Sequence, residues 1–567
     1  VWKDYTGKAI KIGQFEPGGR FAVTPEVMNY RHTDLASNVD PLWLASGKTP
    51  TDFSNHATMV AGVIVGARNG MGGVGVAYDA TIAGYNLPNS GSDFSALKHF
   101  KEFDVVNNSW TATPAFTTEV TDSDFIAAVS EGRNGLGTII VFAGGNDRTV
   151  GGNANDQIIG SNQFSIQVGA INSPSDLSTL QVGKTPFSNP GASLLVSAPG
   201  SNVVSTSNLV MNSQGSTFGS DYTAMEGTSF AAPIVSGVVA LMLQANPKLG
   251  YRDVQQILAL TARKVDDSAA PVAERTSWST NRATNWNNGG MHFSDDYGYG
   301  EVDALAAVRL AETWYKTQTY ANAAHLSVTS KPKPPVGTVI TAANDITKIT
   351  QEAGLRVEHA EVAVDLTVST LSNLVLTLTS PTGTKSVLMN KSGTDIAKIA
   401  TKNADGTYHF SYVFTTTHDL FENSGGVWSI SVVDTNPKDV VTLNSWTLNL
   451  VGSTDIYNDV YVYTNEYRAT VAADVKRAIL NDTNEGNDTI NAAAVSGNST
   501  VNLSTGAASL GAIAVKNLTG TILTISNPGK IENVITGDDS YLLDSANDSV
   551  VELTNGGIDT VKSSITY

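Results

Sequence analysis

The stretch Glu226-Gly227-Thr228-Ser229-Phe230-Ala231-Ala232-Pro233 places a serine among small residues where an apolar run begins. The run that follows, residues 234–243, is apolar on nearly every side and predicts a buried helix. Ser229 would lie at its N-terminal end, where free N–H groups and the helix dipole favour developing negative charge. Pro233 is expected in the first turn, where proline is tolerated. A serine at this place is as typical of a helix N-cap as of a nucleophile, so the spacing alone leaves both open.

A second polar turn that leads into an apolar run contains a histidine, in Asn55-His56-Ala57-Thr58-Met59-Val60-Ala61-Gly62. A serine hydroxyl becomes a good nucleophile when an imidazole accepts its proton, and that imidazole needs a third group to fix its tautomer. In this order along the chain, the two segments resemble the subtilisin-like serine proteases, whose triad runs acid, histidine, serine. The resemblance implies that Ser229 is the nucleophile and His56 the general base.

Two further segments fit the same resemblance. Residues 138–146 read as a buried strand that ends in a Gly-rich turn, and the resemblance implies that Asn146 donates a hydrogen bond to the oxyanion. An ordinary turn asparagine is the alternative. Residues 105–110 are similar to the substrate-binding strand of the family, in which the backbone of Ser109, Trp110 and Thr111 would pair with an extended peptide.

Four other segments narrow the resemblance to the kexin/furin branch, over residues 1 to about 316: they are 1–7, 75–80, 251–255 and 297–304. That branch carries a β-sandwich, the P domain, after its catalytic domain. Here the Pro-rich residues 331–335 are followed by Val, Thr and Leu runs of alternating character, which predict strands. Trp428 and Trp446 are candidates for the core of this sandwich.

We therefore expect a multidomain chain. Residues 1–316 would form a subtilisin-like α/β peptidase domain, whose mainly parallel sheet has helices on both faces. Residues 317–340 would be a linker, and residues 341–453 a β-sandwich similar to the P domain. Residues 454–567 would form a β-rich, β-roll-like module that resembles the C-terminal modules of RTX and serralysin-type proteins and is truncated at its end.

The triad acid is the position at which this chain departs from the family. Subtilases end their first strand in Asp, followed by Asp, Ser or Thr and then Gly, whereas this strand ends in Glu16-Pro17-Gly18-Gly19. Glu16 matches the catalytic acid, and a glutamate can in principle accept the imidazole hydrogen bond and balance its charge. Its extra methylene must be accommodated, because a misplacement of about 1 Å can cost about 10²-fold in rate. A different acid and a disabled site remain the alternatives.

The resemblance implies calcium at two places. Asp34 and Asn69 match ligands of the furin-type site, where carboxylate and amide oxygens suit a hard cation; a helix cap and a turn are the alternatives. After about residue 470 the chain is rich in Asp, Asn, Gly and Thr, and three segments resemble the Gly-x-x-Asp part of calcium-binding RTX repeats. In these segments Asp488, Asp539 and Asp559 would be ligands. Ordinary turns without metal are the alternative, because the nonapeptide period is not sustained.

The residue before the cut is expected to be basic, with moderate selectivity. Kexin-like enzymes prefer basic residues because acids line their cleft, and Asp156 matches one of those acids. Residues 110–114 lack the acid that the branch carries after its Ser-Trp-Gly-Pro segment. We therefore expect a preference for Arg or Lys without a strict requirement for paired basic residues.

Composition and charge narrow the location and the partners. The 567 residues contain no cysteine, which excludes a disulfide framework and a thiol nucleophile. The formal net charge of −18 argues against a nucleic-acid partner and suits a calcium-loaded, secreted or cell-surface bacterial protein. No stretch is expected to span a bilayer, and no signal peptide opens the chain. Both ends look cut, so we expect a fragment of a precursor whose partners are polypeptide substrates and its own propeptide.

These observations predict a calcium-dependent serine endopeptidase. A competing class is a surface or adhesion protein that kept the protease scaffold after its acid changed. Glu16 favours that class, whereas the presence of Ser229, His56 and Asn146 argues against it. A lipase or esterase is disfavoured, because no Gly-x-Ser-x-Gly elbow surrounds the serine.

Overall fold

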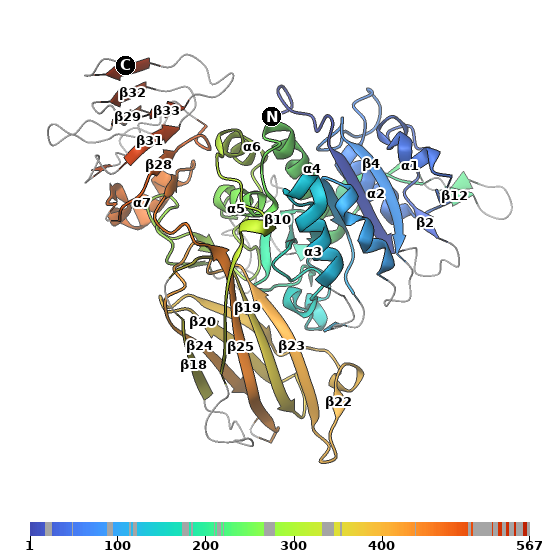
Figure 1. The fold of residues 1–567 in the computed structure, drawn as a ribbon. Coiled ribbons are helices and arrows are strands. Elements are labelled where there is room, and N and C mark those ends of the chain that lie inside the picture. The colour runs from blue at the N-terminus through green and yellow to red at the C-terminus, as the bar shows by residue number, and fades with distance from the viewer. Residues whose placement is uncertain are drawn as a thin grey trace.

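The computed structural model describes most of the chain. The described residues are 1–17, 25–47, 49–87, 94–112, 115–116, 122–172, 181–182, 185–208, 210–211, 217–218, 220–265, 278–330, 345–351, 354–436, 438–482, 484–496, 500–502, 524–525, 531–535, 540–543, 549–551 and 560–563. They form an α/β domain, a β-sandwich and a C-terminal region, as Figure 1 shows. The expected fold class, with a mainly parallel sheet followed by β-rich parts, is confirmed.

The α/β domain is built on a six-stranded sheet in the order β10-β7-β6-β5-β1-β4, with every pairing parallel. The strands are β1 (Lys11–Pro17), β4 (Thr81–Leu87), β5 (Val105–Asn108), β6 (Ile139–Ala143), β7 (Ser165–Ile171) and β10 (Leu194–Pro199). Every residue of β6 is buried. Because successive side chains of a strand point to opposite faces, this burial means that both faces of the sheet are covered.

Five helices of this domain carry its functional segments and its interfaces. They are α2 (Asn55–Val65), α3 (Asp122–Glu131), α4 (Thr228–Ala245), α5 (Tyr251–Thr261) and α6 (Ala304–Thr313). Helix α4 packs on α2, α6 and the central strands of the sheet. Phe125 of α3 stacks on Phe142 of β6, with ring centroids 6.3 Å apart.

Helix α4 is long and apolar enough to cross a membrane, by length and composition only. In the part of the chain that the structure describes it is the one helix that meets this test, and 78% of it is buried inside the protein. It is a core helix, and its apolar character all round follows from its place between the sheet, α2 and α6.

The β-sandwich has two antiparallel sheets. The first has the order β17-β25-β19-β23-β22 and the second the order β18-β24-β20-β21. Their bounds are β17 (Ala324–Ser330), β18 (Asp345–Gln351), β19 (Arg356–Val368), β20 (Leu374–Thr379), β21 (Lys385–Asn390), β22 (Thr401–Lys402), β23 (Tyr408–Thr416), β24 (Gly426–Asp434) and β25 (Val441–Ser453). Trp428 and Trp446 are buried in its core, as expected.

Strand β17 corrects the expected linker over residues 317–340. It pairs with β25 along its whole length and is therefore part of the sandwich. It lies at the edge of its sheet, where its side chains alternate between exposed and half-buried positions. An edge strand with one solvated face has a weak apolar pattern.

The C-terminal region contains short strands that pair in parallel. They include β26 (Val460–Val462), β28 (Asp488–Asn491), β29 (Thr500–Asn502), β31 (Ile531–Ile535), β32 (Ser540–Leu543), β33 (Ser549–Val551) and β34 (Thr560–Ser563). In the described residues these strands form a four-stranded and a three-stranded sheet. Asp539 and Asp559 lie outside the described residues.

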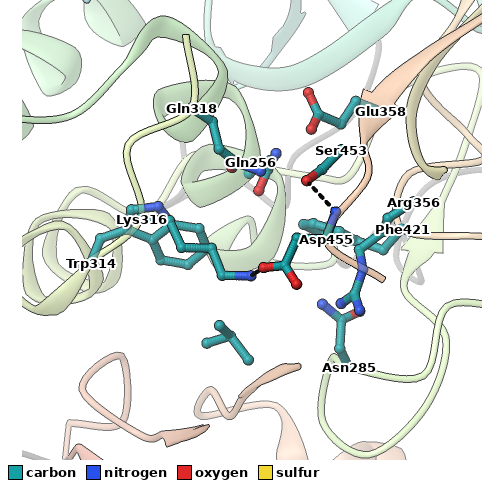
Figure 2. A pocket seen from close by; sticks show the side chains of 11 residues that line it. Gln256, Asn285, Trp314, Lys316, Gln318, Arg356, Glu358, Phe421, Ser453 and Asp455 are labelled. Carbon is teal, nitrogen blue, oxygen red and sulfur yellow. Dashed lines mark hydrogen bonds and ion pairs between the residues drawn. The ribbon is translucent and has the colours of Figure 1, made fainter. Parts of the chain in front are cut away.

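The three parts meet at a polar junction. Arg252 of α5 forms a buried bidentate ion pair with Glu358 of β19, with N–O distances of 2.5 and 2.6 Å. Figure 2 shows a small cavity beside this junction, in which Lys316 Nζ lies 3.1 Å from the carboxylate of Asp455. The α/β domain is thus joined to the sandwich and to the segment that follows it by charged contacts.

Candidate active site

The candidate catalytic residues lie at the carboxyl edge of the parallel sheet. Glu16 is near the end of β1, Ser109 follows β5, and Asn146 lies three residues after β6. Parallel strands place their carboxyl ends at the same edge, which is where open α/β sheets form their sites. Helices α2 and α4 contribute His56 and Ser229, each as the second residue of its helix.

His56 and Glu16 are in contact. Nδ1 of His56 lies 3.2 Å from Oε2 of Glu16, and the carboxylate side chain is 2% exposed. Burial lowers the pKa of His56, but the charge of Glu16 and its hydrogen bond outweigh burial and leave that pKa raised. The longer glutamate side chain therefore reaches the imidazole nitrogen that a triad acid must contact.

Ser229 is half-buried at the start of α4, and the residue after it packs near His56. The ring of Phe230, the next residue, is 5.6 Å from the imidazole ring, centroid to centroid. The Ser229 hydroxyl donates to the carbonyl oxygen of Ser109 at 3.0 Å. In many enzymes the hydrogen bonds between catalytic groups form only when substrate binds.

Pro233 is the sixth residue of α4 and not part of its first turn, which corrects the expectation. Proline has no N–H, so the carbonyl of Ser229, four residues earlier, loses its helical donor. The hydroxyl of Ser109 donates to that carbonyl at 2.8 Å. Ser109 and Ser229 are thereby joined in both directions.

Asn146 is held by its carbonyl oxygen. Oδ1 accepts from the backbone N–H of Thr228 at 2.9 Å and from the Thr228 hydroxyl at 3.0 Å. The amide nitrogen approaches Gly227, where an added Cβ would lie 3.3 Å from it. Gly227 has φ of +138°, a conformation that favours glycine. Asn146 can therefore donate through Nδ2 near Ser229.

The predicted substrate strand has a buried side. Trp110 packs against Phe94 and Phe142, with centroid distances of 5.9 and 5.5 Å, so its ring supports the core. Thr111 lies on the wall of a cavity of about 280 Å³. Asp156 lines the same cavity and is 2% exposed.

Asp156 is an acid in an unusual setting. Its Oδ2 accepts from the hydroxyl of Ser392, in the β-sandwich, at 3.2 Å. Its Oδ1 has no hydrogen-bond partner among the described residues. Burial raises the pKa of Asp156 to about 8, although the hydrogen bond from Ser392 opposes the shift.

The residues expected at the first calcium site are brought together. Asn69 donates from Nδ2 to Oδ1 of Asp34 at 2.8 Å. The hydroxyl of Tyr222, which sequence reasoning missed, donates to Oδ2 of Asp34 at 2.8 Å. Asp34 is fully buried; its oxygens and the amide oxygen of Asn69, which here accepts from the backbone N–H of Met71, are of the kind that calcium prefers.

Asp488, the third described candidate ligand, lies near two other carboxyls. It is fully buried, and its Oδ1 accepts from the backbone N–H of Asp459 at 2.6 Å. Burial and a hydrogen bond with Asp482 raise the pKa of Asp488 to about 8. The geometry that a metal site requires is met by no group of three or more His, Cys, Asp or Glu side chains in the described residues.

Sequence reasoning missed the residues that hold the site in place. Thr228, which fixes Asn146, adjoins Ser229 in the sequence and could have been found from that position. Ser392 is more than two hundred residues away from Asp156, and nothing local in the sequence indicates the contact.

Residues 22–300 match the Subtilase family, and residues 357–450 match the Proprotein convertase P-domain. Neuroendocrine convertase 2 from Homo sapiens is 28% identical over 511 residues, which cover 85% of this chain and 74% of that protein. Proprotein convertase subtilisin/kexin type 4 from Homo sapiens is 29% identical over 452 residues, 75% of this chain and 55% of that protein.

Among solved structures, a serine protease of Aeromonas sobria is similar, with a TM-score of 0.61, 21% identity, and coverage of 79% of this chain and 89% of that one. A structure of that protease in complex with the chaperone ORF2 has the same TM-score of 0.61 and the same identity of 21%. The match covers 79% of this chain and 88% of the other chain. At this identity the likeness concerns the fold.

Proposed function

We propose that this chain, whose residues 22–300 match the Subtilase family and whose residues 357–450 match the Proprotein convertase P-domain, is a kexin-like serine endopeptidase that cleaves polypeptides through an acyl-enzyme formed on Ser229. The observation that carries the proposal is the 3.2 Å contact between His56 Nδ1 and the buried carboxylate of Glu16. It supports a Ser-His-Glu triad in place of a scaffold without its acid.

In this mechanism Ser229 Oγ attacks the scissile carbonyl while His56 takes its proton. Glu16 holds the imidazole in the required tautomer and balances its positive charge. Nδ2 of Asn146 and the backbone N–H of Ser229 donate to the oxyanion. His56 then protonates the leaving amine, and water hydrolyses the ester in the reverse sequence.

The test is cleavage of an Arg-containing chromogenic peptide by the full chain. Ser229→Ala should abolish cleavage, whereas Ser130→Ala, on the distant helix α3, should leave it unchanged. Ser229-dependent activity in the parent supports a working triad that contains His56 and Glu16. If the parent does not cleave the peptide but Glu16→Asp does, the scaffold is disabled at its acid. Failure of a serine-directed fluorophosphonate probe to label Ser229 in the parent would support the same conclusion.

We also propose a moderate preference for Arg or Lys before the cut. The support is Asp156, an acid on the wall of the cavity that Thr111 also lines. A cationic side chain would pair with its carboxylate and stabilise the charged form. A peptide library that shows no enrichment of basic residues at this position would contradict the preference.

We propose that calcium supports the fold at two places. Asp34 with Asn69, and Asp488, offer the hard oxygen donors that this ion prefers, so backbone oxygens or water would complete each site, since no group of three acidic side chains in the described residues has metal-site geometry. Calcium would there neutralise buried acids. We expect chelation to lower the Tm of the Ser229→Ala variant, which excludes autolysis, and calcium to restore it. An unchanged Tm would contradict the proposal. We also propose that the C-terminal region binds calcium in the manner of RTX repeats.

Export is proposed as well, because the relatives are convertases and the chain has a net charge of −18 without cysteine. A propeptide or chaperone would assist its folding, as the Aeromonas sobria complex suggests for that protein. We expect the protein in the culture medium of its host, and poor recovery of activity after unaided refolding. A purely intracellular location would contradict export.

A further inference from the structure

The cavity that Asp156 lines is built by two domains. The α/β domain supplies Thr111, Asp147, Asp156 and Asn189, and the P domain supplies Gly393 and Thr394, which follow β21. The volume, about 280 Å³, is enough for one large side chain.

The cavity adjoins the residues proposed to bind the oxyanion. Asp147 directly follows Asn146. A Cβ added to Gly145 would lie 2.3 Å from Asn189 Nδ2 and 3.4 Å from Thr111 Cγ2, so the cavity wall touches the turn that carries Asn146. A substrate whose scissile carbonyl reaches Asn146 would place the side chain before the cut at this cavity.

The P-domain segment at the cavity is fitted closely to its partner. A Cβ on Gly393 would lie 2.2 Å from the carbonyl oxygen of Val150, so only glycine permits this approach. Ser392 donates to Asp156, and Tyr412 donates from its hydroxyl to the carbonyl of Asn155 at 3.0 Å. Strand β23 and residues 392–394 thus hold both sides of the turn that carries Asp156.

The segment after the substrate strand is anchored in the same way. Phe116 is 4% exposed and belongs to the core of the P domain, although it is part of the α/β domain. Its ring meets those of Phe410 and Tyr412 at centroid distances of 5.4 and 4.9 Å. Its N–H donates to the carbonyl of Asp156 at 2.7 Å. The P domain therefore fixes the position of both cavity walls.

We propose that the P domain forms part of the pocket for the substrate side chain before the cut, and that Thr394 helps to determine which side chain is accepted. This rests on the proposed function. Thr394 is half-buried and lines the cavity without a hydrogen-bonding role for its side chain in the described contacts, so a charged side chain can be introduced here without removing a hydrogen bond of the side chain.

The test compares Thr394→Asp with Thr394→Lys in the full chain in calcium. Two peptides that differ only in Arg or Ala before the cut are used, and the readout is the ratio of their kcat/KM values. Because a charge on the cavity wall attracts or repels the Arg side chain of the substrate and has no such direct effect on Ala, Thr394→Asp should raise the Arg-to-Ala ratio about threefold to tenfold, and Thr394→Lys should lower it by a similar factor. A merely structural effect would not reverse sign with charge.

Matched controls are Thr401→Asp and Thr401→Lys, at an exposed threonine of β22 that does not line the cavity. Their ratios should equal that of the parent. Cleavage with ratios that do not move in opposite directions at position 394 would overturn the inference alone. Absence of any Ser229-dependent cleavage would overturn the proposed function and the inference with it.

Discussion

Among single residues, Glu16 sets the pH range in which His56 can act as a base. His56 must be neutral to accept the proton of Ser229, and its raised pKa keeps it protonated to higher pH than an ordinary histidine. The parent should therefore lose activity as pH falls through that raised pKa. In Glu16→Gln the charge is removed, the pKa of His56 falls, and the acid limb of kcat/KM should move to lower pH while the rate drops about 10²- to 10⁴-fold.

The measurement is kcat/KM of one peptide from about pH 5 to 9 for both proteins. Glu226→Gln is the matched control, because Glu226 is an exposed acid close to Ser229 in sequence. An acid limb that stays in place in Glu16→Gln would show that another acid faces His56.

Asp156 predicts a pH dependence of selectivity. Burial raises its pKa to about 8, and the other titratable groups near it are Asp147 on the cavity wall and Tyr412. Below that pH a guanidinium must displace the proton of Asp156 in order to bind. The kcat/KM ratio of Arg to Ala peptides should therefore rise with pH up to about 8, by at most about tenfold per unit.

Two variants check this pH dependence. In Asp156→Asn the ratio should be flat and low, whereas Asp147→Asn should keep the slope. A flat ratio in the parent would contradict the assignment of Asp156 to the pocket.

Most of the candidate triad could be predicted because its residues lie in contiguous motifs. Ser229 and His56 each occupy the start of an apolar helix, where the pattern is local. The function of Glu16 could not be decided from the sequence, because the question was whether one more methylene fits, and that depends on the distance between β1 and α2. The structure places the two groups 3.2 Å apart.

At the scale of elements, helix α4 depends on a neighbouring strand. Pro233 leaves the carbonyl of Ser229 without a helical donor, and Ser109 supplies one. Ser109→Ala should destabilise the protein by about 1–3 kcal/mol, because the Ser229 carbonyl loses its donor and the buried Asn107 Nδ2 loses its acceptor. With Pro233→Ala in place, the new N–H can donate to Ser229, and Ser109→Ala should cost about 1 kcal/mol less.

Denaturant unfolding of the four proteins in this double-mutant cycle gives the coupling energy. Each protein should also carry a Ser229→Ala substitution, which prevents autolysis and keeps the carbonyl. Additive costs would show that Ser109 does not replace the missing helical donor.

Elements with both faces buried were predictable, and edge elements were not. The run that forms α4 and the Val/Ile segment that forms β6 are apolar almost throughout, so their composition alone indicates that they are buried. The segment of β17 was predicted to be a linker because its own sequence pattern is weak. Its strand conformation depends on pairing with β25, far along the chain, which the local sequence does not indicate.

Across the whole molecule, the contacts between domains carry no local sequence signal. Phe116 reads as a loop residue, yet it packs in the core of the P domain. Arg252 lies in a helix whose pattern says only that it is amphipathic, and its partner Glu358 belongs to another domain. Such pairs depend on how two folded domains pack against each other. The order of the domains could therefore be predicted from the sequence, whereas the contacts between them could not.

The Arg252–Glu358 pair gives a prediction about that docking. Both side chains are at most 3% exposed, and the guanidinium also donates to the carbonyl of Thr319 and to Asn322 at 3.1 and 3.0 Å.

Arg252→Ala or Glu358→Ala leaves a buried charge without its partner and should destabilise the protein by about 3–5 kcal/mol. Arg252→Met combined with Glu358→Leu should cost much less, because neither charge remains buried. Calorimetry in the Ser229→Ala background measures these changes, with Lys101→Ala as the control, since that exposed lysine pairs with the exposed Glu131 at the surface and should contribute little. If the combined variant is as unstable as the single ones, the interface depends on the ion pair itself and not on the absence of unpaired charge.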